Sequence, residues 1–330
     1  MRNLHTGRVA VVLAGILVVV AFGFGCSRPV EELPDFDSLW NYQDLAATEQ
    51  EFRLVLSRAE ATGDLAYRLE LKTQIARALG LQGKFAQAHR MLDQVELDLG
   101  GEPPDSLAVA HIRYLIERGR VINSFGSPEE ARLVFEDAWE RAQAVGADYH
   151  AIDAAHMMGI ASPPAEQLAW NRRAMGLAER TQDERGRNWL GPLYHNSGMT
   201  CLAAGEYKDA LGYFEKEWAQ RKDAGKEAGT ERQTRIAKWS VAHTLRKLER
   251  TAAALTMQRE LEAECQEAGE PDGFVFEEIA ECLLAQGHKR EARPYFQQAY
   301  EHLREVLWLK QGEPERIARL RSLGSGGEQP

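Results

Sequence analysis

The sequence predicts an all-α fold in which about six helix–turn–helix units follow one another as a solenoid. Composition is the first reason: Ala, Leu, Glu, Arg and Gln dominate the 330 residues, Pro is sparse, and β-branched runs are missing beyond the first 25 residues. The second reason is that small and apolar residues recur at matched positions along most of the chain. Such recurrence indicates stacked helix pairs without one central core.

The clearest unit lies at residues 194–222. Small residues stand where two antiparallel helices would cross, a glycine stands at the turn, and aromatic side chains would fill the gap to the next pair. These positions are Tyr194, Gly198, Cys201, Gly205, Tyr207, Ala210 and Phe214. The stretch resembles one tetratricopeptide repeat (TPR), whose pattern is W-x2-L-G-x2-Y…A-x3-F. The resemblance implies a right-handed α-α superhelix.

Five further stretches align with this unit, and the six units start near residues 69, 112, 148, 191, 235 and 273. The eighth position is always Ala or Gly: Ala76, Gly119, Ala155, Gly198, Ala242 and Ala280. The turn position is mostly glycine: Gly83, Gly126, Ser162, Gly205, Glu249 and Gly287. Units three and five depart most, because Ser162 and Glu249 replace the turn glycine, and Asn171 and Gln258 replace an aromatic residue.

The N-terminus predicts a targeting segment over residues 1–25. Arg2 and Arg8 precede an uncharged apolar run, which ends in Gly25-Cys26. This resembles a bacterial lipoprotein signal, which implies that Cys26 is lipidated and becomes the mature N-terminus. An uncleaved membrane anchor and ordinary secretion are the alternatives. The resemblance implies a lipid-anchored, periplasm-facing protein of the bacterial cell envelope, and Ser27 favours the outer membrane.

The remaining chain divides by composition. Residues 26–43 are expected to form the lipidated cysteine and a polar linker, and 44–323 the solenoid. Helices at 44–61 and 314–323 would cap its two ends, because an end repeat needs a covering helix. The tail at 324–330 is expected to be disordered.

Charge and motifs exclude several functions. The formal net charge is −10 and falls to −12 without Arg2 and Arg8, so nucleic acid is a poor partner. The sequence contains no P-loop, dinucleotide turn, H-E-x-x-H or nucleophile elbow. We therefore expect no enzymatic activity and no cofactor.

Two clusters need a separate explanation. His150, Asp153 and His156 are spaced by three on one helix, which spreads them too far for a metal site, so Asp153 is expected to pair with a neighbouring histidine. Cys265 and Cys282 lie on consecutive helices, but their heights differ by several Å, so a disulfide would need favourable geometry.

The TPR resemblance implies that the first helix of each pair lines a concave groove, through repeat positions two, five, six, nine, twelve and thirteen. Asn196 stands where the family often uses Asn to hold a bound peptide backbone, and the Arg and His residues would favour an acidic or C-terminal segment. An ordinary polar inner face is the alternative. The groove residues are Arg77, Arg120, Asn123, His156, His195, Asn196, Trp239, His243 and Arg246, with Glu277 and Glu281 at the far end.

Two function classes follow. The first is a non-catalytic, membrane-anchored scaffold that binds a partner protein or an extended peptide in the groove. The second is a small-ligand or metal-dependent activity in the groove, which uses His150, Asp153 and His156 or the region of His195 and His243. Self-assembly through an uncapped end is a third possibility, and the two capping helices argue against it, so a monomer is expected.

Overall fold

The computed structural model describes residues 32–223 and 230–326, and all the regular elements in these ranges are helices. The fold is therefore all-α, as the composition predicts. The targeting segment, Cys26 and residues 327–330 lie outside the described residues. Within the described ranges no helix is long and apolar enough to cross a membrane.

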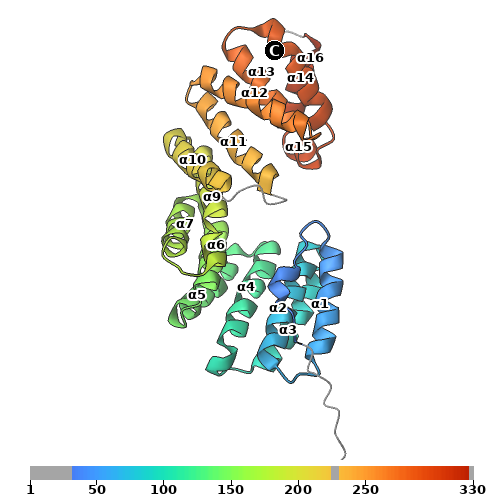
Figure 1. The fold of residues 1–330 in the computed structure, drawn as a ribbon, viewed down its shortest axis with the longest axis vertical. Coiled ribbons are helices and arrows are strands. Elements are labelled where there is room, and N and C mark those ends of the chain that lie inside the picture. The colour runs from blue at the N-terminus through green and yellow to red at the C-terminus, as the bar shows by residue number, and fades with distance from the viewer. Residues whose placement is uncertain (1–31, 224–229, 327–330) are drawn as a thin grey trace, which may run out of the picture.

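Six antiparallel helix pairs make up most of the chain (Figure 1). The short α8 (Glu184–Arg187) is inserted between the third and fourth pairs, and the 3-10 helix η2 (Asp105–Leu107) precedes the second pair. The pairs are α2 (Leu65–Leu81) with α3 (Phe85–Leu99), α4 (Ala108–Ser124) with α5 (Pro128–Ala144), α6 (Asp148–Ala161) with α7 (Pro164–Ala178), α9 (Leu190–Ala203) with α10 (Tyr207–Asp223), α11 (Thr230–Lys247) with α12 (Thr251–Glu267), and α13 (Gly273–Ala285) with α14 (Lys289–Leu303).

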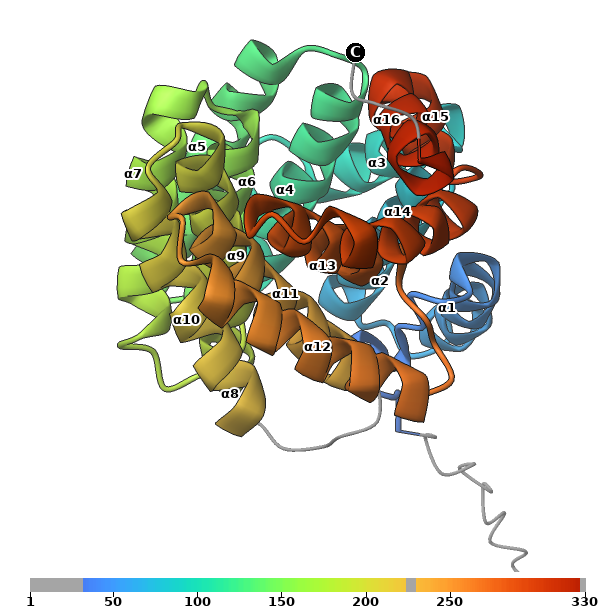
Figure 2. The ribbon, with the colours of Figure 1, turned by 90° about the horizontal axis from the view of Figure 1, so that it is seen from above.

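The pairs stack into a superhelix instead of folding around one centre. Seen along the long axis, α13, α14 and α16 pass over α2 and α3, so the chain winds through most of a turn (Figure 2). The helices α2, α4 and α6 line the inside of the N-terminal half, while α5 and α7 lie outside. The apolar side chains correspondingly form three successive clusters along the chain. This arrangement leaves an inner, concave face.

Glycines at the helix crossings let the two helices of a pair approach closely. A Cβ atom on Gly119 would lie 2.4 Å from the Phe135 ring, and one on Gly198 would lie 2.5 Å from the Phe214 ring. Both rings are fully buried, so they cannot move aside. The small-residue column is thus a packing requirement of each pair.

The turns inside the pairs follow one geometry, with one exception. Gly83, Gly126, Gly205 and Gly287 all have φ between 73° and 86°, which a glycine adopts without steric cost. Glu249 takes the same conformation, with φ 61°, although it has a side chain. In the third pair the first helix ends differently, because Ser162 is extended at φ −88° and ψ 152°.

Additional helices cover both ends. At the N-terminal end, α1 (Leu45–Ala59) packs on α2, and the Asp44 carboxylate accepts a hydrogen bond from the Ala47 amide at its start. At the C-terminal end, α15 (Leu307–Gly312) leads to α16 (Pro314–Ser325), which packs on α14. The expectation of a disordered tail from residue 324 is wrong for residues 324–326, because α16 extends through Ser325.

The three described cysteines, Cys201, Cys265 and Cys282, are buried free thiols, and no disulfide joins the last two. Burial raises the pKa of the Cys282 thiol to about 12, so it is protonated at neutral pH. These cysteines therefore serve as small apolar side chains in the core.

Candidate binding groove

A row of alternating charges crosses the inner face of the first three pairs. Glu117 lies between Arg77, at 3.7 Å, and Arg120, and Arg120 also donates a hydrogen bond to Asp153. Burial alone would raise the pKa of Asp153, but the Arg120 guanidinium outweighs it and lowers that pKa. The expected pairing of Asp153 with a histidine is wrong, because Arg120 from the neighbouring pair reaches the carboxylate. No group of described residues can hold a metal ion.

A segment that precedes the solenoid lies on this same inner face. Residues Phe36–Leu39 form the 3-10 helix η1, whose start is capped by Asp35. The Tyr67 hydroxyl donates a hydrogen bond to the Pro34 carbonyl at 2.7 Å, and Trp40 Nε1 donates to Gln74 Oε1 at 3.2 Å. The described part of the expected linker therefore packs on the first pair, because apolar Phe36 and Trp40 give these residues a surface to bury.

Two arginines hold the acidic side chain of this segment. Arg113 donates two hydrogen bonds to the Asp37 carboxylate, and Arg185 Nη1 donates a third at 3.2 Å. Arg113 also lies 5.2 Å from the centre of the buried Phe36 ring. Glu70 Oε2 is 3.2 Å from Arg113 Nε, without hydrogen-bond alignment, and burial raises the pKa of this carboxyl despite the nearby arginine.

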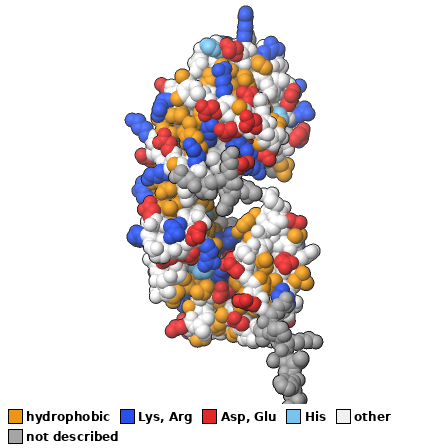
Figure 3. All heavy atoms as spheres, viewed as in Figure 1, with side chains coloured by type: hydrophobic (Ala, Val, Ile, Leu, Met, Phe, Trp, Pro, Cys, Tyr) orange, Lys and Arg blue, Asp and Glu red, His pale blue; other side chains and the backbone are white. Residues whose placement is uncertain are grey.

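Beside the segment the groove stays open as a pocket of about 720 Å³. Figure 3 shows basic, acidic and histidine side chains inside the hollow of the N-terminal half. The pocket is lined by side chains from η1, α2, α4, α6, α8 and the residues before α8. Those that carry aromatic rings or charge are Asp35, Phe36, Asp37, Tyr67, Glu70, Arg113, Asp148, Tyr149, His150, Arg180, Asp183 and Arg185.

His150 is the unusual member of this pocket wall. Its side chain is only 6% exposed, and it makes no hydrogen bond to any residue in the described part of the chain. Burial, helped by the positive charge of Arg113, lowers its pKa to about 3, so the imidazole is neutral. A neutral imidazole carries one hydrogen-bond donor and one acceptor.

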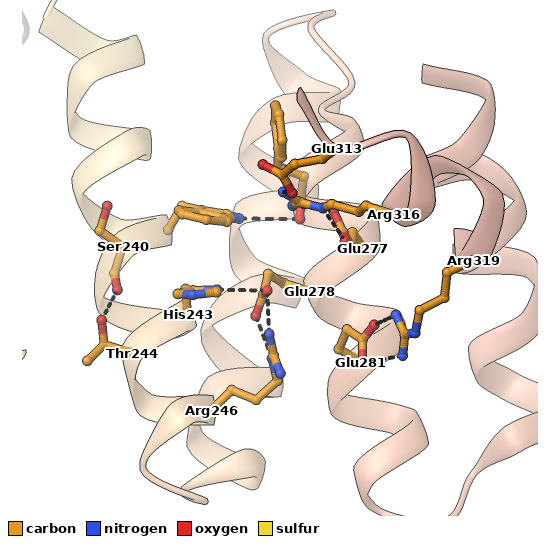
Figure 4. A network of polar contacts seen from close by, with 12 residues as sticks. Ser240, His243, Thr244, Arg246, Glu277, Glu278, Glu281, Glu313, Arg316 and Arg319 are labelled. Atoms are coloured by element: carbon orange, nitrogen blue, oxygen red, sulfur yellow. Dashed lines mark hydrogen bonds and ion pairs between the residues drawn. The ribbon is translucent and has the colours of Figure 1, made fainter. Parts of the chain in front are cut away.

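In the C-terminal half the groove charges neutralise one another (Figure 4). Glu278 accepts hydrogen bonds from His243, at 2.8 Å, and from Arg246, at 2.7 and 2.8 Å. Burial would raise the pKa of Glu278, but these bonds outweigh it and lower the pKa to about 2. The two acidic residues at the far end are paired as well. Arg316 of α16 donates hydrogen bonds to Glu277, and Arg319 of α16 donates to Glu281.

The other predicted groove residues also find partners within the chain. His195 Nδ1 lies 3.0 Å from the Glu217 carboxylate on α10, and Asn196 Nδ2 lies 3.4 Å from His156 Nδ1. Trp239 donates a hydrogen bond to the Phe274 carbonyl at 3.3 Å and stacks on His243.

The predicted residues therefore form two groups. Arg77, Arg120 and His156 lie with the first three pairs, where Arg77 is 5.6 Å from the Trp40 ring and Asn123 is half-buried nearby on α4. Trp239, His243 and Arg246 lie in the C-terminal half. Asn196 and His156 connect the fourth pair to the third.

Among the pocket side chains that sequence analysis missed are Glu70, Arg113 and Tyr149. All three occupy position two of their repeats, which belongs to the groove set, so the same alignment contained the signal. It also missed Phe36 and Asp37. Their sequence signal was the presence of the aromatic residues Phe36 and Trp40 before the first predicted helix.

No protein-family model matches the chain, and no curated protein matches it. Solved structures do. A STAND signal-transduction ATPase with a TPR sensor from Pyrococcus horikoshii matches with a TM-score of 0.64 and 14% identity, over 83% of this chain and 42% of that one. The chain thus spans less than half the length of that protein.

Weaker matches include a TPR protein from Parabacteroides merdae, with a TM-score of 0.45 and 16% identity over 86% of this chain and 93% of that one. BtubC from P. vanneervenii matches with a TM-score of 0.43 and 13% identity over 90% and 94%. The comparison with the STAND protein and the helix pairs agree on one conclusion, that this chain has the α-α superhelical fold of TPR proteins.

Proposed function

We propose that this protein is a non-catalytic scaffold that binds an extended segment of a partner protein on the concave face of its first three helix pairs. One observation carries the proposal: the pocket of about 720 Å³ on that face, whose wall combines arginines with tyrosines.

The chemistry of the pocket wall suits a peptide better than a reacting substrate. Arg180 can bind a carboxylate, as Arg113 and Arg185 already bind that of Asp37, while Tyr67 and Tyr149 offer aromatic surface. The C-terminal half offers fewer free side chains to a ligand, because His243 and Arg246 are already hydrogen-bonded to Glu278. We therefore place binding in the N-terminal half and not at the groove residues of the C-terminal half, Trp239, His243 and Arg246.

The proposed scaffold is anchored to a bacterial membrane through lipidated Cys26. This part of the proposal is supported by the sequence pattern at the N-terminus. About ten residues separate Cys26 from η1, and a fully extended chain of that length spans at most roughly 35 Å. The lipid would therefore hold the N-terminal end of the groove close to the membrane surface. A partner that is captured there would be kept at the same surface.

Reversal of one pocket charge tests this function. The intact chain is purified from native membranes in mild detergent, and the proteins that accompany it are identified by mass spectrometry. Arg180→Glu places a negative charge in the pocket wall and should reduce the captured partner at least tenfold, because the substitution repels an acidic segment. Arg290→Glu, the same exposed charge change on α14, should retain the partner. A partner retained at the wild-type level by Arg180→Glu would contradict the proposal.

A small-molecule binder is the second candidate, and the pocket volume supports it. About 720 Å³ lies within the range of small-ligand sites, roughly 300 to 1,000 Å³. Native mass spectrometry of the purified protein separates the two functions. A stoichiometric bound mass of a few hundred daltons, lost in Tyr149→Ala, would favour the small ligand, and its absence would favour the scaffold.

A further inference from the structure

We propose that the partner segment has the chemistry of the chain's own Asp35–Trp40, and that it binds by displacing those residues from the groove. The inference rests on the proposed function and names the class of partner: a short segment with an acidic residue between aromatic residues. The chain's own segment then occupies the groove as an internal competitor.

The contacts of this segment are those of a ligand on a receptor. It belongs to none of the six pairs and lies across the inner face of α2 and α4. The Tyr67 hydroxyl donates a hydrogen bond to the carbonyl of Pro34, which directly precedes the segment, and the Trp40 side chain donates one to Gln74. Gln74 occupies repeat position six and Arg113 occupies position two, so both belong to the groove set.

Charge determines what can replace the segment. The Asp37 carboxylate accepts hydrogen bonds from Arg113 and Arg185, and Arg113 is only 7% exposed. If Asp37 left without a substitute, the nearly buried guanidinium would keep only Glu70, which meets it without hydrogen-bond alignment. Removal of one partner from a buried ion pair is strongly unfavourable. A competing segment must therefore carry its own carboxylate to this point.

The apolar contacts select the neighbouring residues. Phe36 packs edge-on against Tyr67 at 5.1 Å and beneath Arg113, and it is 6% exposed. Trp40 packs against Phe52 at 5.2 Å, and Arg77 lies over its ring. Both sites accept a planar ring beside a cation, which is favourable for aromatic side chains. An acidic segment without aromatic residues would leave both sites empty.

Displacement has room to proceed from the open pocket. Asp35, Phe36 and Asp37 line that pocket together with Tyr149 and His150. A partner segment can therefore enter beside the chain's own segment before replacing it. The internal segment has a high effective concentration because it is tethered, so it weakens every competitor by a constant factor. Weakening the internal segment should reveal the intrinsic affinity of the groove.

The test uses a fluorescein-labelled peptide of residues 32–42 (Glu-Leu-Pro-Asp-Phe-Asp-Ser-Leu-Trp-Asn-Tyr), titrated with the full chain by fluorescence anisotropy. We expect the double variant Phe36→Ala/Asp37→Ala to bind this peptide at least tenfold more tightly than the wild type, because its internal competitor is weakened. Addition of Arg113→Ala to that variant should abolish the gain. A scrambled peptide of the same composition should bind at least tenfold more weakly to the double variant.

Equal affinity of the double variant and the wild type, with unchanged helicity, would overturn the inference, as would equal binding of the scrambled peptide. If the double variant loses helicity, Asp37→Asn takes its place, with an expected gain of at least threefold; no gain there overturns the inference as well. A dimer of the wild type that exchanges these segments would assign the occupant to a second copy and also overturn it. Loss of the partner in Arg180→Glu without peptide binding would leave the proposed function intact and refute this inference alone.

Discussion

At the scale of single residues, the two polar substitutions in the aromatic column have different consequences. Asn171 fits its site because Gly159 stands opposite it: a Cβ atom there would lie 2.7 Å from the Asn171 amide oxygen. Gln258 is completely buried, and neither its amide nitrogen nor its amide oxygen has a hydrogen-bond partner. Both residues stand out in the sequence, but only the structure shows which one is unsatisfied.

Gln258→Met should therefore stabilise the protein. Methionine has a similar length and removes the unpaired amide, so we expect a gain of about 1 to 3 kcal/mol in the free energy of unfolding. Chemical denaturation followed by circular dichroism measures it. The control is Gln266→Met, on the exposed side of the same helix, which should change stability by no more than about 0.5 kcal/mol. A Gln258→Met variant that is less stable than the wild type would show that the Gln258 amide has hydrogen-bond partners.

Histidine burial predicts a loss of stability at mildly acidic pH. The pKa of His150 is lowered to about 3 and that of His156 to about 4, from 6.5. The unfolded chain therefore takes up these protons first. The contribution of the two neutral histidines to the free energy of unfolding is complete above pH 6.5. It is lost as the pH falls toward their pKa values in the folded protein. The pKa of Glu278 is about 2 in place of 4.5, so the stability that this carboxylate contributes is lost only below pH 4.5.

Between pH 6.5 and 5.0, each buried histidine should cost about 1 to 2 kcal/mol of unfolding free energy. Denaturation curves at the two pH values give the change. His150→Asn should reduce the pH dependence, while His288→Asn, at an exposed turn, should leave it unaltered. The same pH dependence in the wild type and in His150→Asn would contradict the role assigned to burial.

At the scale of helices and turns, most of the architecture could be predicted. Close contact between paired helices requires small residues at fixed spacing, and Gly119 and Gly198 meet buried rings as that requirement implies. Turn glycines identified the helix ends for the same reason. The position of η1 could not be predicted, because a four-residue 3-10 helix has no periodicity and its stability comes from contacts with Tyr67 and Arg113, far away in sequence.

The turn of the fifth pair gives a prediction at this scale. Glu249 has φ 61°, a conformation that costs a non-glycine residue about 1 kcal/mol. Glu249→Gly should stabilise the protein by a similar amount, less the greater freedom of glycine in the unfolded chain. Gly205→Ala, at the matching turn of the fourth pair, should destabilise it. Thermal unfolding of the two variants measures both effects, and a destabilised Glu249→Gly would contradict the strain at this turn.

At the scale of the whole molecule, the chain covers its own groove at both ends. The segment Asp35–Trp40 lies on the inner face of the first pairs, and α16 places Arg316 and Arg319 on Glu277 and Glu281 of the last pair. The repeat pattern predicted a set of groove residues but not their pairing, because Arg246 and Glu278 are partners only through the stacking of successive pairs. What stays open is the pocket beside η1.

Site-specific photo-crosslinking tests the central claim, that binding occurs at this pocket, most directly. A benzophenone amino acid is placed at Arg180, which is exposed and lines the pocket, or at Leu133, which is 70% exposed on the outer helix α5. Irradiation in native membranes is followed by mass spectrometry of the products. We expect a partner protein joined at position 180 and none at position 133. A partner joined at position 133 and absent from position 180 would contradict the account.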